Sequence, residues 1–348
     1  MKILIDILHP AHVHFFRNFI AEMKQRNHQL CITARQKDVT LELLREYGIE
    51  HIPISEIGKG KLNLGKELLT RNLKLIKICR QFRPDILLGV MGPSIATVGA
   101  LLRIPRIVFY NNENAHATNW FVYPLANAVV TSSSYARKIT GNHITYQGYH
   151  EYAYLHPRWF TPNLKTLAAN GIDPKEKFIL VRFVSWQASH DVGEKGLNDK
   201  VKLVQELEQF AKVYITSESN VPEELKKNVL LLQNKKDIFD IMSQAALIFG
   251  EGATMASEAA LLGVPAVYVN SLQLGYLQEQ ERNYHLVYNF TNQEQGLQKA
   301  KELLQQKNLR KEHQQRLDTL RQEKIDVTQW MIYFVEKFSL SGTPEVDV

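Results

Sequence analysis

Short apolar runs alternate with segments of helical periodicity through the first half of the chain. The apolar runs predict strands, and the segments with apolar residues every three or four positions predict helices. Such alternation is typical of a parallel sheet with helices on both faces. We expect strands at 2–7, 29–33, 85–90, 106–110 and 127–131, and helices near 13–26, 38–47, 63–82 and 94–102.

A second series of the same kind follows a stretch, 141–175, that glycines and prolines interrupt. Near the end of the chain, 321–340 repeats apolar residues at three- and four-residue spacing, which predicts a helix that packs into a core and crosses back onto the first domain. The fold class is therefore α/β, with Rossmann-like parallel-sheet domains at 1–160 and 161–320 that face a cleft. The strands of the second domain are expected at 178–184, 212–216, 229–232, 245–249 and 266–269.

Composition bounds the size and class of the protein. The 348 residues are 45% hydrophobic, which is enough for two cores. Cys31 and Cys79 lie far apart and form no C-x-x-C motif, so neither disulfides nor a cysteine metal site is expected. The chain opens directly with a strand pattern and has no run of 18 apolar residues. We therefore expect a cytoplasmic protein without a signal peptide or a spanning helix.

The net charge of +6 is unevenly distributed. Residues 1–160 carry 20 Lys and Arg against 11 Asp and Glu, whereas 161–348 carry 22 against 25. A basic first domain attracts phosphate or anionic lipid, although a solvated surface of chance composition explains the same imbalance. No pattern of aromatic and basic residues points to RNA or DNA, so no nucleic-acid partner is expected.

The most informative segment is 246–269, which reads as buried strand, glycine turn, helix, Gly-x-Pro stop and second strand. The turn places the backbone N–H groups of Gly252, Ala253 and Thr254 at a helix N-terminus, where a diphosphate can bind. Glu258 lies within reach of a ribose attached to that diphosphate. A dinucleotide fold is a weaker alternative, since a methionine replaces the last glycine of G-x-G-x-x-G, and an ordinary glycine turn stays open.

The loop after the first strand contains His9, His12 and His14. A neutral imidazole at the carboxyl end of a strand can take a proton from a hydroxyl nucleophile. His12 is the better candidate base because it lies nearest the helix start, His14 is the second, and His9 is a candidate for acceptor binding. The irregular spacing argues against a metal site, and a structural role for any one histidine stays open. Residues 89–94, after the fourth strand, form another glycine-containing turn into a helix, which suits phosphate binding.

Polar residues also follow the fifth strand. Burial of three consecutive polar side chains, those of Asn112, Glu113 and Asn114, would be costly. We therefore expect them to face a solvent-accessible site that binds the acceptor. Glu113 is the candidate for orienting the catalytic base, or else it caps the following helix. The aromatic segment 120–123 is a candidate for membrane contact, although burial in the core is the more ordinary outcome for such residues.

Candidates in the second domain follow its strands as well. Arg182 and Ser185, at the end of its first strand, can supply charge and a hydroxyl group to phosphate. Gln278 and Gln280 come after the last expected strand. They can hold sugar hydroxyls, or else they lie on a surface face of a helix.

These residues resemble those of GT-B glycosyltransferases, above all the family that forms lipid II by transfer of N-acetylglucosamine. Residues 11–13 resemble the Gly-His-Val end of that family's first loop, and 112–114 resemble its His-Glu-Gln-Asn segment. Residues 251–265 resemble its Ser-Gly-Ala-x-Thr-x-x-Glu segment and the Gly-x-Pro that follows. The resemblance implies that Glu258 holds the ribose and that the amides of 252–254 hold the diphosphate.

Two longer motifs resemble a prokaryotic family of unknown function, domain of unknown function 354, which is thought to be GT-B-like. They are I-D-x-x-H-P-A-H-V-H-F-F at 5–16 and R-F-V-S-W-x-A-S-H-D-V-G at 182–193. The chain departs from the lipid II-forming transferases at 184–189, which replaces a glycine-rich phosphate loop. UDP-N-acetylglucosamine 2-epimerases share the architecture, but they carry a Glu-Glu pair where this chain has Ser257 and Glu258.

We therefore expect a glycosyltransferase that takes a nucleotide-sugar, UDP-linked in the first instance, as its substrate and uses no cofactor. No D-x-D motif occurs to anchor a metal–diphosphate complex, so the reaction is expected to be metal-independent. The acceptor is unknown. A lipid-linked intermediate of envelope polysaccharide synthesis is one candidate, with peripheral association at the inner face of the membrane. A nucleotide-sugar 2-epimerase and a non-catalytic nucleotide-sugar-binding protein are the alternatives.

Overall fold

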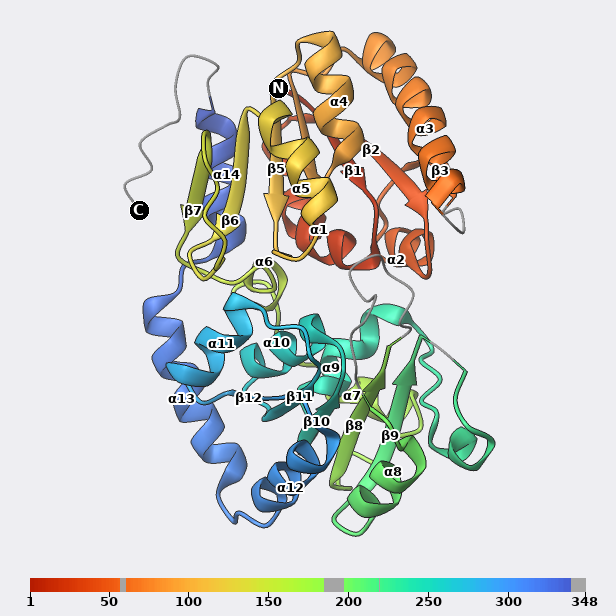
Figure 1. The fold of residues 1–348 in the computed structure, drawn as a ribbon, viewed down its shortest axis with the longest axis vertical. Helices are drawn as coiled ribbons and strands as arrows, with labels where there is room; N and C mark the ends of the chain where they lie inside the picture. The colour runs from red at the N-terminus through yellow and green to blue at the C-terminus, as the bar shows by residue number, and fades with distance from the viewer. Residues whose placement is uncertain (57–60, 185–196, 219, 339–348) are drawn as a thin grey trace. The chain divides into compact units, whose positions relative to one another are not determined.

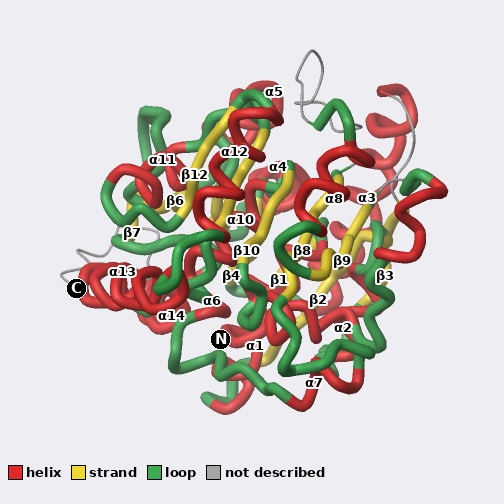
Figure 2. Tube along the Cα trace, turned by 90° about the horizontal axis from the view of Figure 1, so that it is seen from below, coloured by secondary structure: helices red, strands yellow, loops and turns green. Residues whose placement is uncertain are grey.

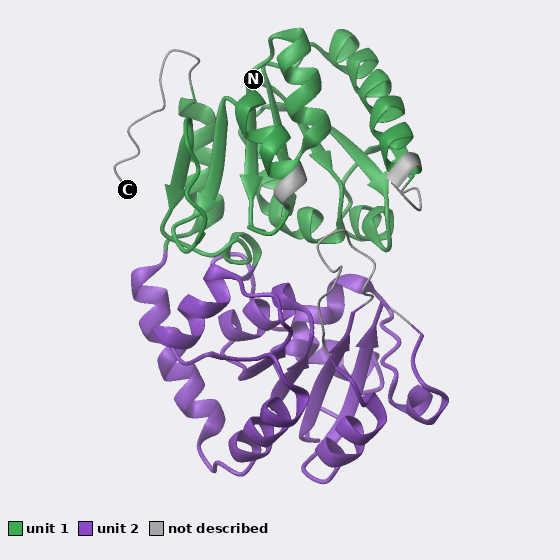
Figure 3. Ribbon diagram, in the orientation of Figure 1, with its two compact units in different colours: residues 1–154, 325–348 green, residues 155–324 purple. Residues whose placement is uncertain are grey.

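The computed structural model describes residues 1–56, 61–184, 197–218 and 220–338, with the backbone alone at 61–62 and 116–117. The chain divides into two compact units, which Figure 3 shows in separate colours. The first is Met1–Tyr154 together with Ile325–Val348, and the second is Leu155–Lys324. Each unit is built on a parallel sheet flanked by helices, which confirms the predicted α/β class (Figure 1; Figure 2).

The sheet of the first unit has seven strands in the order β3-β2-β1-β4-β5-β6-β7. Helices α3, α4 and α5 pack in sequence along one face, while α1 packs against α2 and α14 on the other. The strands are β1 (Lys2–Ile7), β2 (Gln29–Gln36), β3 (Ile52–Glu56), β4 (Ile86–Val90), β5 (Arg106–Tyr110), β6 (Ala128–Ser132) and β7 (His143–Tyr146). The helices are α1 (Pro10–Gln25), α2 (Thr40–Glu46), α3 (Lys61–Phe82), α4 (Pro93–Leu102), α5 (His116–Val122), α6 (Tyr152–Leu155) and α14 (Val327–Lys337).

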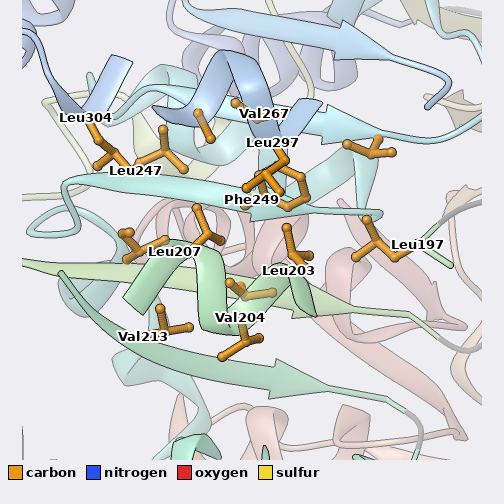
Figure 4. Close-up of a cluster of buried hydrophobic side chains, with 14 of the residues drawn as sticks. Leu197, Leu203, Val204, Leu207, Val213, Leu247, Phe249, Val267, Leu297 and Leu304 are labelled. Atoms are coloured by element: carbon orange, nitrogen blue, oxygen red, sulfur yellow. The ribbon is translucent and has the colours of Figure 1, made fainter. Parts of the chain in front are cut away.

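The sheet of the second unit has five strands in the order β12-β11-β10-β8-β9. In its core, Phe249 lies between Leu203 and Leu297, which come from helices on the same face of the sheet (Figure 4). The strands are β8 (Phe178–Phe183), β9 (Lys212–Ser217), β10 (Leu247–Gly250), β11 (Ala266–Val269) and β12 (Val287–Phe290). The helices are α7 (Lys165–Ala169), α8 (Lys200–Glu208), α9 (Ile238–Met242), α10 (Ala253–Leu261), α11 (Gly275–Arg282), α12 (Gln293–Leu304) and α13 (Leu309–Glu323).

The differences from the expected strands lie at the margins of the sheets. The strand expected at 229–232 is absent, and Val229 forms only an isolated bridge with Ile215. Strands β3, β7 and β12 were not expected, and all three are edge strands. These three strands are covered on fewer sides, so their residues are partly exposed and they lack the continuous apolar run of a buried strand.

The C-terminal helical region is two helices rather than one. Asp326 begins α14 as its N-cap, and its side chain accepts a hydrogen bond from the amide of Gln329. The helix belongs to the first unit, where it contacts α1 and where Thr328 donates to the carbonyl of Ala153 at 2.7 Å. Among the described helices, none combines the length and the hydropathy that crossing a bilayer requires.

Candidate functional site

Each sheet contains one point at which the order of strand addition reverses. In the first unit it lies between β1 and β4, and in the second between β8 and β10. Proteins of this class bind ligands beyond the carboxyl ends of the strands at such points. His9 and His12 follow β1, and Gly252 follows β10, so the main candidates of each unit lie at these two positions.

Two glycines shape the turn between β10 and α10. A Cβ on Gly250 would lie 2.6 Å from the carbonyl oxygen of Arg182, so only glycine allows this approach of β10 to β8. Gly252 is the N-cap of α10 and offers the helix no side chain. Within the described residues, no group accepts a hydrogen bond from the amides of Ala253 and Thr254, and both residues are partly exposed. An uncapped and accessible first turn of this kind attracts anions.

Arg182 lies beside this turn. Its Cγ is 3.4 Å from the position that a Cβ on Gly252 would take, and its guanidinium forms an ion pair with Glu218. Glu258, on α10, is 7% exposed. Ser185, the other phosphate candidate, lies outside the described residues. The structure therefore brings Arg182 to the expected phosphate turn, and the ribose-binding role of Glu258 stays a prediction.

Glu251, inside the same turn, has a role that sequence analysis missed. It is 2% exposed, and its carboxylate accepts hydrogen bonds from the amides of Leu197 at 2.8 Å and Val184 at 3.2 Å. Glu251 therefore ties both Val184, at the end of β8, and Leu197 to the turn that leaves β10. The sequence signal for this role was an acidic residue between two glycines of a turn next to a buried strand. A buried carboxylate is costly unless it has hydrogen-bond partners.

The two glutamines of α11 have different surroundings. Gln280 is fully buried, and its Nε2 donates to Oγ of Ser257 at 2.9 Å, which ties α11 to α10. Gln278 is partly exposed and donates to the side chain of Gln273 at 2.9 Å. The structure does not bring the two side chains together, and a sugar-binding role for either stays a prediction.

The first turn of α1 is closed by its own residues. The helix begins at Pro10 rather than near residue 13, because His9 serves as its N-cap. Nδ1 of His9 accepts a hydrogen bond from the amide of Ala11 at 3.2 Å. Pro10 has no amide hydrogen, and the amide of His12 donates to the carbonyl of His9 at 3.0 Å. At the start of α1, a ligand would therefore meet the edges of the histidine rings rather than open backbone amides.

His12 is 8% exposed, and its Nδ1 accepts a hydrogen bond from the amide of Leu8 at 3.3 Å. Burial, together with neighbouring positive groups, holds the pKa of His12 well below its usual value, so the ring is neutral near pH 7. A neutral ring whose Nδ1 accepts carries its hydrogen on Nε2. In this tautomer Nε2 can donate to an oxygen, whereas a base at Nε2 needs the hydrogen on Nδ1; the base role of His12 stays a prediction.

His14 is enclosed by aromatic neighbours. Its Nδ1 lies 3.3 Å from the hydroxyl of Tyr47, and its ring centroid lies 5.5 Å from that of Tyr154. Burial first, and then the charge of Arg17, lower the pKa of His14. Among the described residues, no three His, Cys, Asp or Glu side chains gather as ligands of one metal ion.

The polar residues after β5 hold their own loop together. Oδ1 of Asn112 accepts a hydrogen bond from the amide of Asn114 at 2.8 Å, which forms an Asx turn. Oε1 of Glu113 accepts from the amide of Ala136 at 3.1 Å and so joins this loop to the one after β6. Helix α5 has no side-chain cap, so Glu113 does not cap it. Contacts of these three residues with an acceptor stay predictions.

A buried charge network near the end of β1 was also missed. Asp6 and Arg71, which are 0% and 1% exposed, form an ion pair. Arg71 donates to Ser55 at 2.6 Å, and Glu67 accepts from both Ser55 and Arg35. The network links β1, β2, β3 and α3, and it fixes the strand end from which the histidine loop starts.

The fold resembles solved structures of two kinds of enzyme. The UDP-GlcNAc 2-epimerase from Neisseria meningitidis, bound to UDP-GlcNAc, matches with a TM-score of 0.67 and 13% identity, over 97% of this chain and 100% of that chain. The spinosyn rhamnosyltransferase SpnG, complexed with thymidine diphosphate, matches with a TM-score of 0.65 and 12% identity, over 97% and 100%. These matches confirm a fold of the GT-B kind.

Sequence comparisons agree with the motifs. An uncharacterised protein of Methanocaldococcus jannaschii is 24% identical over 302 residues, which cover 82% of this chain and 87% of that protein. A family model described as "Protein of unknown function (DUF354)" matches residues 1–330. The match confirms the resemblance that the motifs at 5–16 and 182–193 carry.

Proposed function

The chain belongs to the DUF354 family, and we propose that it is a glycosyltransferase whose second unit binds a nucleoside diphosphate sugar. The observation that carries the proposal is the first turn of α10, which is uncapped and partly exposed. In the proposed complex the amides of Ala253 and Thr254 donate to the diphosphate, and Arg182 adds a positive charge. Glu258 accepts hydrogen bonds from the ribose hydroxyls.

The ligands of similar structures support this ligand class. One is bound to UDP-GlcNAc and another is complexed with thymidine diphosphate. What these ligands share is a nucleoside diphosphate, whose phosphates fit the turn before α10.

In the proposed reaction an acceptor hydroxyl attacks the anomeric carbon of the sugar and gives its proton to a general base, and the nucleoside diphosphate leaves with the electrons of the broken C–O bond. The positive end of α10 stabilises the charge that develops on the leaving group. The absence of a D-x-D motif from the sequence favours a reaction that relies on this helix and Arg182 rather than on a metal ion.

The alternative activity is nucleotide-sugar 2-epimerisation, which one of the similar structures performs. Incubation of the purified protein with UDP-N-acetylglucosamine alone separates the two reactions. We expect the sugar to remain unchanged in proton NMR spectra. Formation of the 2-epimer without any acceptor would eliminate the transferase.

A thermal-shift screen with UDP-, GDP- and dTDP-linked sugars tests nucleotide binding directly. A ligand at 100 times its dissociation constant raises the free energy of unfolding by about 2.7 kcal/mol. CMP-linked sugars serve as the control because they carry a single phosphate. We expect at least one diphosphate sugar to raise the melting temperature. A screen in which none does so would contradict the proposal.

The first unit carries an exposed apolar face on helices α3, α4 and α5. Leu69 and Leu73 of α3 are 68% and 70% exposed, Leu101 of α4 is 69% exposed, and Trp120 of α5 is 83% exposed. The exposure of Trp120 overturns the expectation of burial for this residue, whereas Val122 is buried. The three helices pack side by side, so these side chains belong to one layer.

Basic residues accompany this apolar face. Helix α3 exposes Lys66, Lys74, Lys77 and Arg80, and its one acidic residue, Glu67, is buried. Apolar side chains beside Lys and Arg on a helix surface are typical of binding to anionic lipid. We propose that this face binds an anionic membrane surface, which suits a lipid-linked acceptor.

Sedimentation with phosphatidylserine vesicles tests the membrane proposal. The double variant Leu69→Ser and Leu73→Ser should lose vesicle binding. Leu231→Ser, at an 81% exposed position of the second unit, is the matched control and should keep it. Equal binding by both variants would overturn the proposal.

A further inference from the structure

The helix that follows β4, in the first unit, begins with an uncapped turn. Gly92 is the N-cap of α4 and brings no side-chain oxygen, and Pro93, the first helical residue, has no amide hydrogen. The first helical bond runs from the amide of Ala96 to the carbonyl of Gly92 at 2.9 Å. Among the described residues, none accepts a hydrogen bond from the amides of Ser94 and Ile95. Two backbone donors therefore stay open at this helix start.

The hydroxyl of Ser94 is a third donor at the same helix start. Ser94 is 0% exposed, and its Oγ has no hydrogen-bond partner in the described part of the chain. The Cα–Cβ bonds of a helix tilt toward its N-terminus, so this short side chain, on the second helical residue, points toward the open end. Buried donors in folded proteins are nearly always paired. We therefore expect an acceptor here that the described residues do not supply.

The backbone of this turn disfavours a cap from the chain itself. Met91 has a φ of 54°, in the left-handed region that non-glycine residues rarely adopt. A Cβ on Gly92 would lie 3.1 Å from Cβ of Ile95, which leaves little room for a capping side chain. Met91 and Pro93 are partly exposed, so the edge of the turn reaches the surface. The local sequence therefore leaves the turn uncapped and accessible at its edge.

The turn lies at the reversal point of the first sheet, between β1 and β4. Its neighbour in β1 is Asp6, which pairs in register with Gly89. The carboxylate of Asp6 accepts a hydrogen bond from Thr33 at 2.6 Å and forms an ion pair with Arg71, and it bonds neither open amide. This negative charge is therefore offset by Arg71, while the positive end of the α4 dipole faces the open turn.

We propose that the first turn of α4 binds a phosphate group through the amides of Ser94 and Ile95 and the hydroxyl of Ser94. One phosphate group carries negative charge and several acceptor oxygens, which match three donors at a helix N-terminus. The inference rests on the proposed function in one respect, because it makes this phosphate part of the acceptor. The nucleotide sugar then occupies the α10 turn of the second unit, and the acceptor phosphate occupies the α4 turn of the first.

An NMR titration observes the two amides without a substitution. Inorganic phosphate is titrated into ¹⁵N-labelled protein at constant ionic strength, with saturating UDP so that the α10 turn is filled. We expect the amide proton signals of Ser94 and Ile95 to move downfield, because both amides donate to phosphate. Sodium acetate and sodium chloride are the controls. Equal shifts with either salt, or no shift at the two amides, would overturn the inference.

Ser94→Ala removes one of the three donors and keeps the backbone. We expect it to weaken phosphate binding by about 10- to 100-fold, because a hydrogen bond to a charged group is lost. Ser133→Ala is the matched control, since Ser133 is exposed and its hydroxyl donates to Gln147 at 2.9 Å. Equal affinity for phosphate in the two variants would contradict the proposal.

Unfolding in phosphate-free buffer separates binding from a structural role of Ser94. A buried hydroxyl without a partner lowers stability, so Ser94→Ala should unfold at the same urea concentration as the unmodified protein or at a higher one. Phosphate should then raise the midpoint of the unmodified protein more than that of the variant. A lower midpoint for Ser94→Ala without phosphate would show that the hydroxyl has a partner within the protein, and would overturn the inference.

The titrations distinguish failure of this inference from failure of the proposed function. Binding of UDP depends on the α10 turn, so Ser94→Ala should keep it. If UDP does not bind to the unmodified protein, the proposed function fails, while the amide signals of Ser94 and Ile95 still decide whether the α4 turn binds phosphate.

Two phosphate esters identify the source of the phosphate. Glycerol 3-phosphate and the soluble short-chain lipid dihexanoyl phosphatidic acid are titrated into the unmodified protein and Ser94→Ala. Tighter binding of the lipid, weakened in Ser94→Ala, assigns the site to a lipid phosphate, and equal affinities for the two esters assign it to a soluble phosphate ester. Titrations in which Ser94→Ala binds both esters as tightly as the unmodified protein would contradict a phosphate site at this turn.

Discussion

The two units end their first strands in contrasting ways. Strands β1 and β8 each lie at the reversal point of a sheet, and each carries a charged residue one position before its end. In β1 this is Asp6, which is fully buried against Arg71. In β8 it is Arg182, whose side chain is 23% exposed and pairs with Glu218. The first unit encloses its charge pair, whereas the second leaves a cation within reach of a ligand.

The helix starts at the two reversal points differ as well. Helix α1 closes its first turn with His9 and Pro10, while α10 begins after Gly252 with open amides. The same topology therefore gives one helix start that its own residues cap and one whose first amides stay open to an anion. The following changes test that contrast.

Substitution of Arg71 should have the largest effect on stability. Arg71→Met leaves the Asp6 carboxylate buried without its ion partner, so we expect the free energy of unfolding to fall by about 3–5 kcal/mol. Arg182→Met removes the partner of an exposed pair and should change it by about 1 kcal/mol or less. Urea denaturation measures both. Equal losses of unfolding free energy in the two variants would contradict the distinction between the buried Asp6–Arg71 pair and the more exposed Arg182–Glu218 pair.

Substitution of Glu251 should loosen the second unit locally. Glu251→Gln turns an NH₂ group toward the amide of Val184 or Leu197, so one buried donor loses its acceptor at a cost of about 1–3 kcal/mol. We expect faster hydrogen exchange at these two amides. Glu223→Gln, at an 81% exposed side chain, is the control. Unchanged protection of the two amides would show that Glu251 does not hold Val184 and Leu197.

Acidification should act on the first unit through His150. The ring stacks on Phe15 with centroids 3.7 Å apart, and burial lowers the pKa of His150 to about 3, against 6.5 for an ordinary histidine. Between these values the unfolded chain holds a proton that the folded chain lacks. The free energy of unfolding therefore falls as pH falls, by about 1.4 kcal/mol per pH unit for this one group.

His150→Phe should remove that contribution. We expect the variant to lose stability less steeply than the unmodified protein when urea denaturation is repeated at decreasing pH below 6.5. A slope that matches the unmodified protein would show that His150 takes up its proton in the folded state.

The sequence predicted the interior of each sheet better than its margins. Most interior strands are buried and read as continuous apolar runs, whereas the edge strands β3, β7 and β12 do not. Strand β9 is also an edge strand, but its four central residues are buried and its apolar run was predicted. The phosphate turn was visible because its two glycines stand out in the sequence, and Gly250 has a local steric reason to be glycine.

Features of the candidate site that the sequence did not predict depend on tertiary contacts. Trp120 is exposed although it is aromatic, and Gln280 is buried because Ser257 accepts its amide hydrogen. The tautomer of His12 depends on the position of a single amide, that of Leu8, which a residue pattern does not specify. The role of Glu251 likewise depends on the amides of Val184 and Leu197, which lie far from it in the sequence.

The central claim is that the amides at the start of α10 bind the diphosphate of a nucleotide sugar. Ala253→Pro removes one of these amides at the first helical residue, a position that tolerates proline, and Lys200→Pro makes the same change at the first residue of α8. Titration calorimetry with the nucleoside diphosphate selected by the screen should show about 10- to 100-fold weaker binding for Ala253→Pro, with the melting temperature kept, and unchanged binding for Lys200→Pro. Equal affinity in both variants would contradict the account.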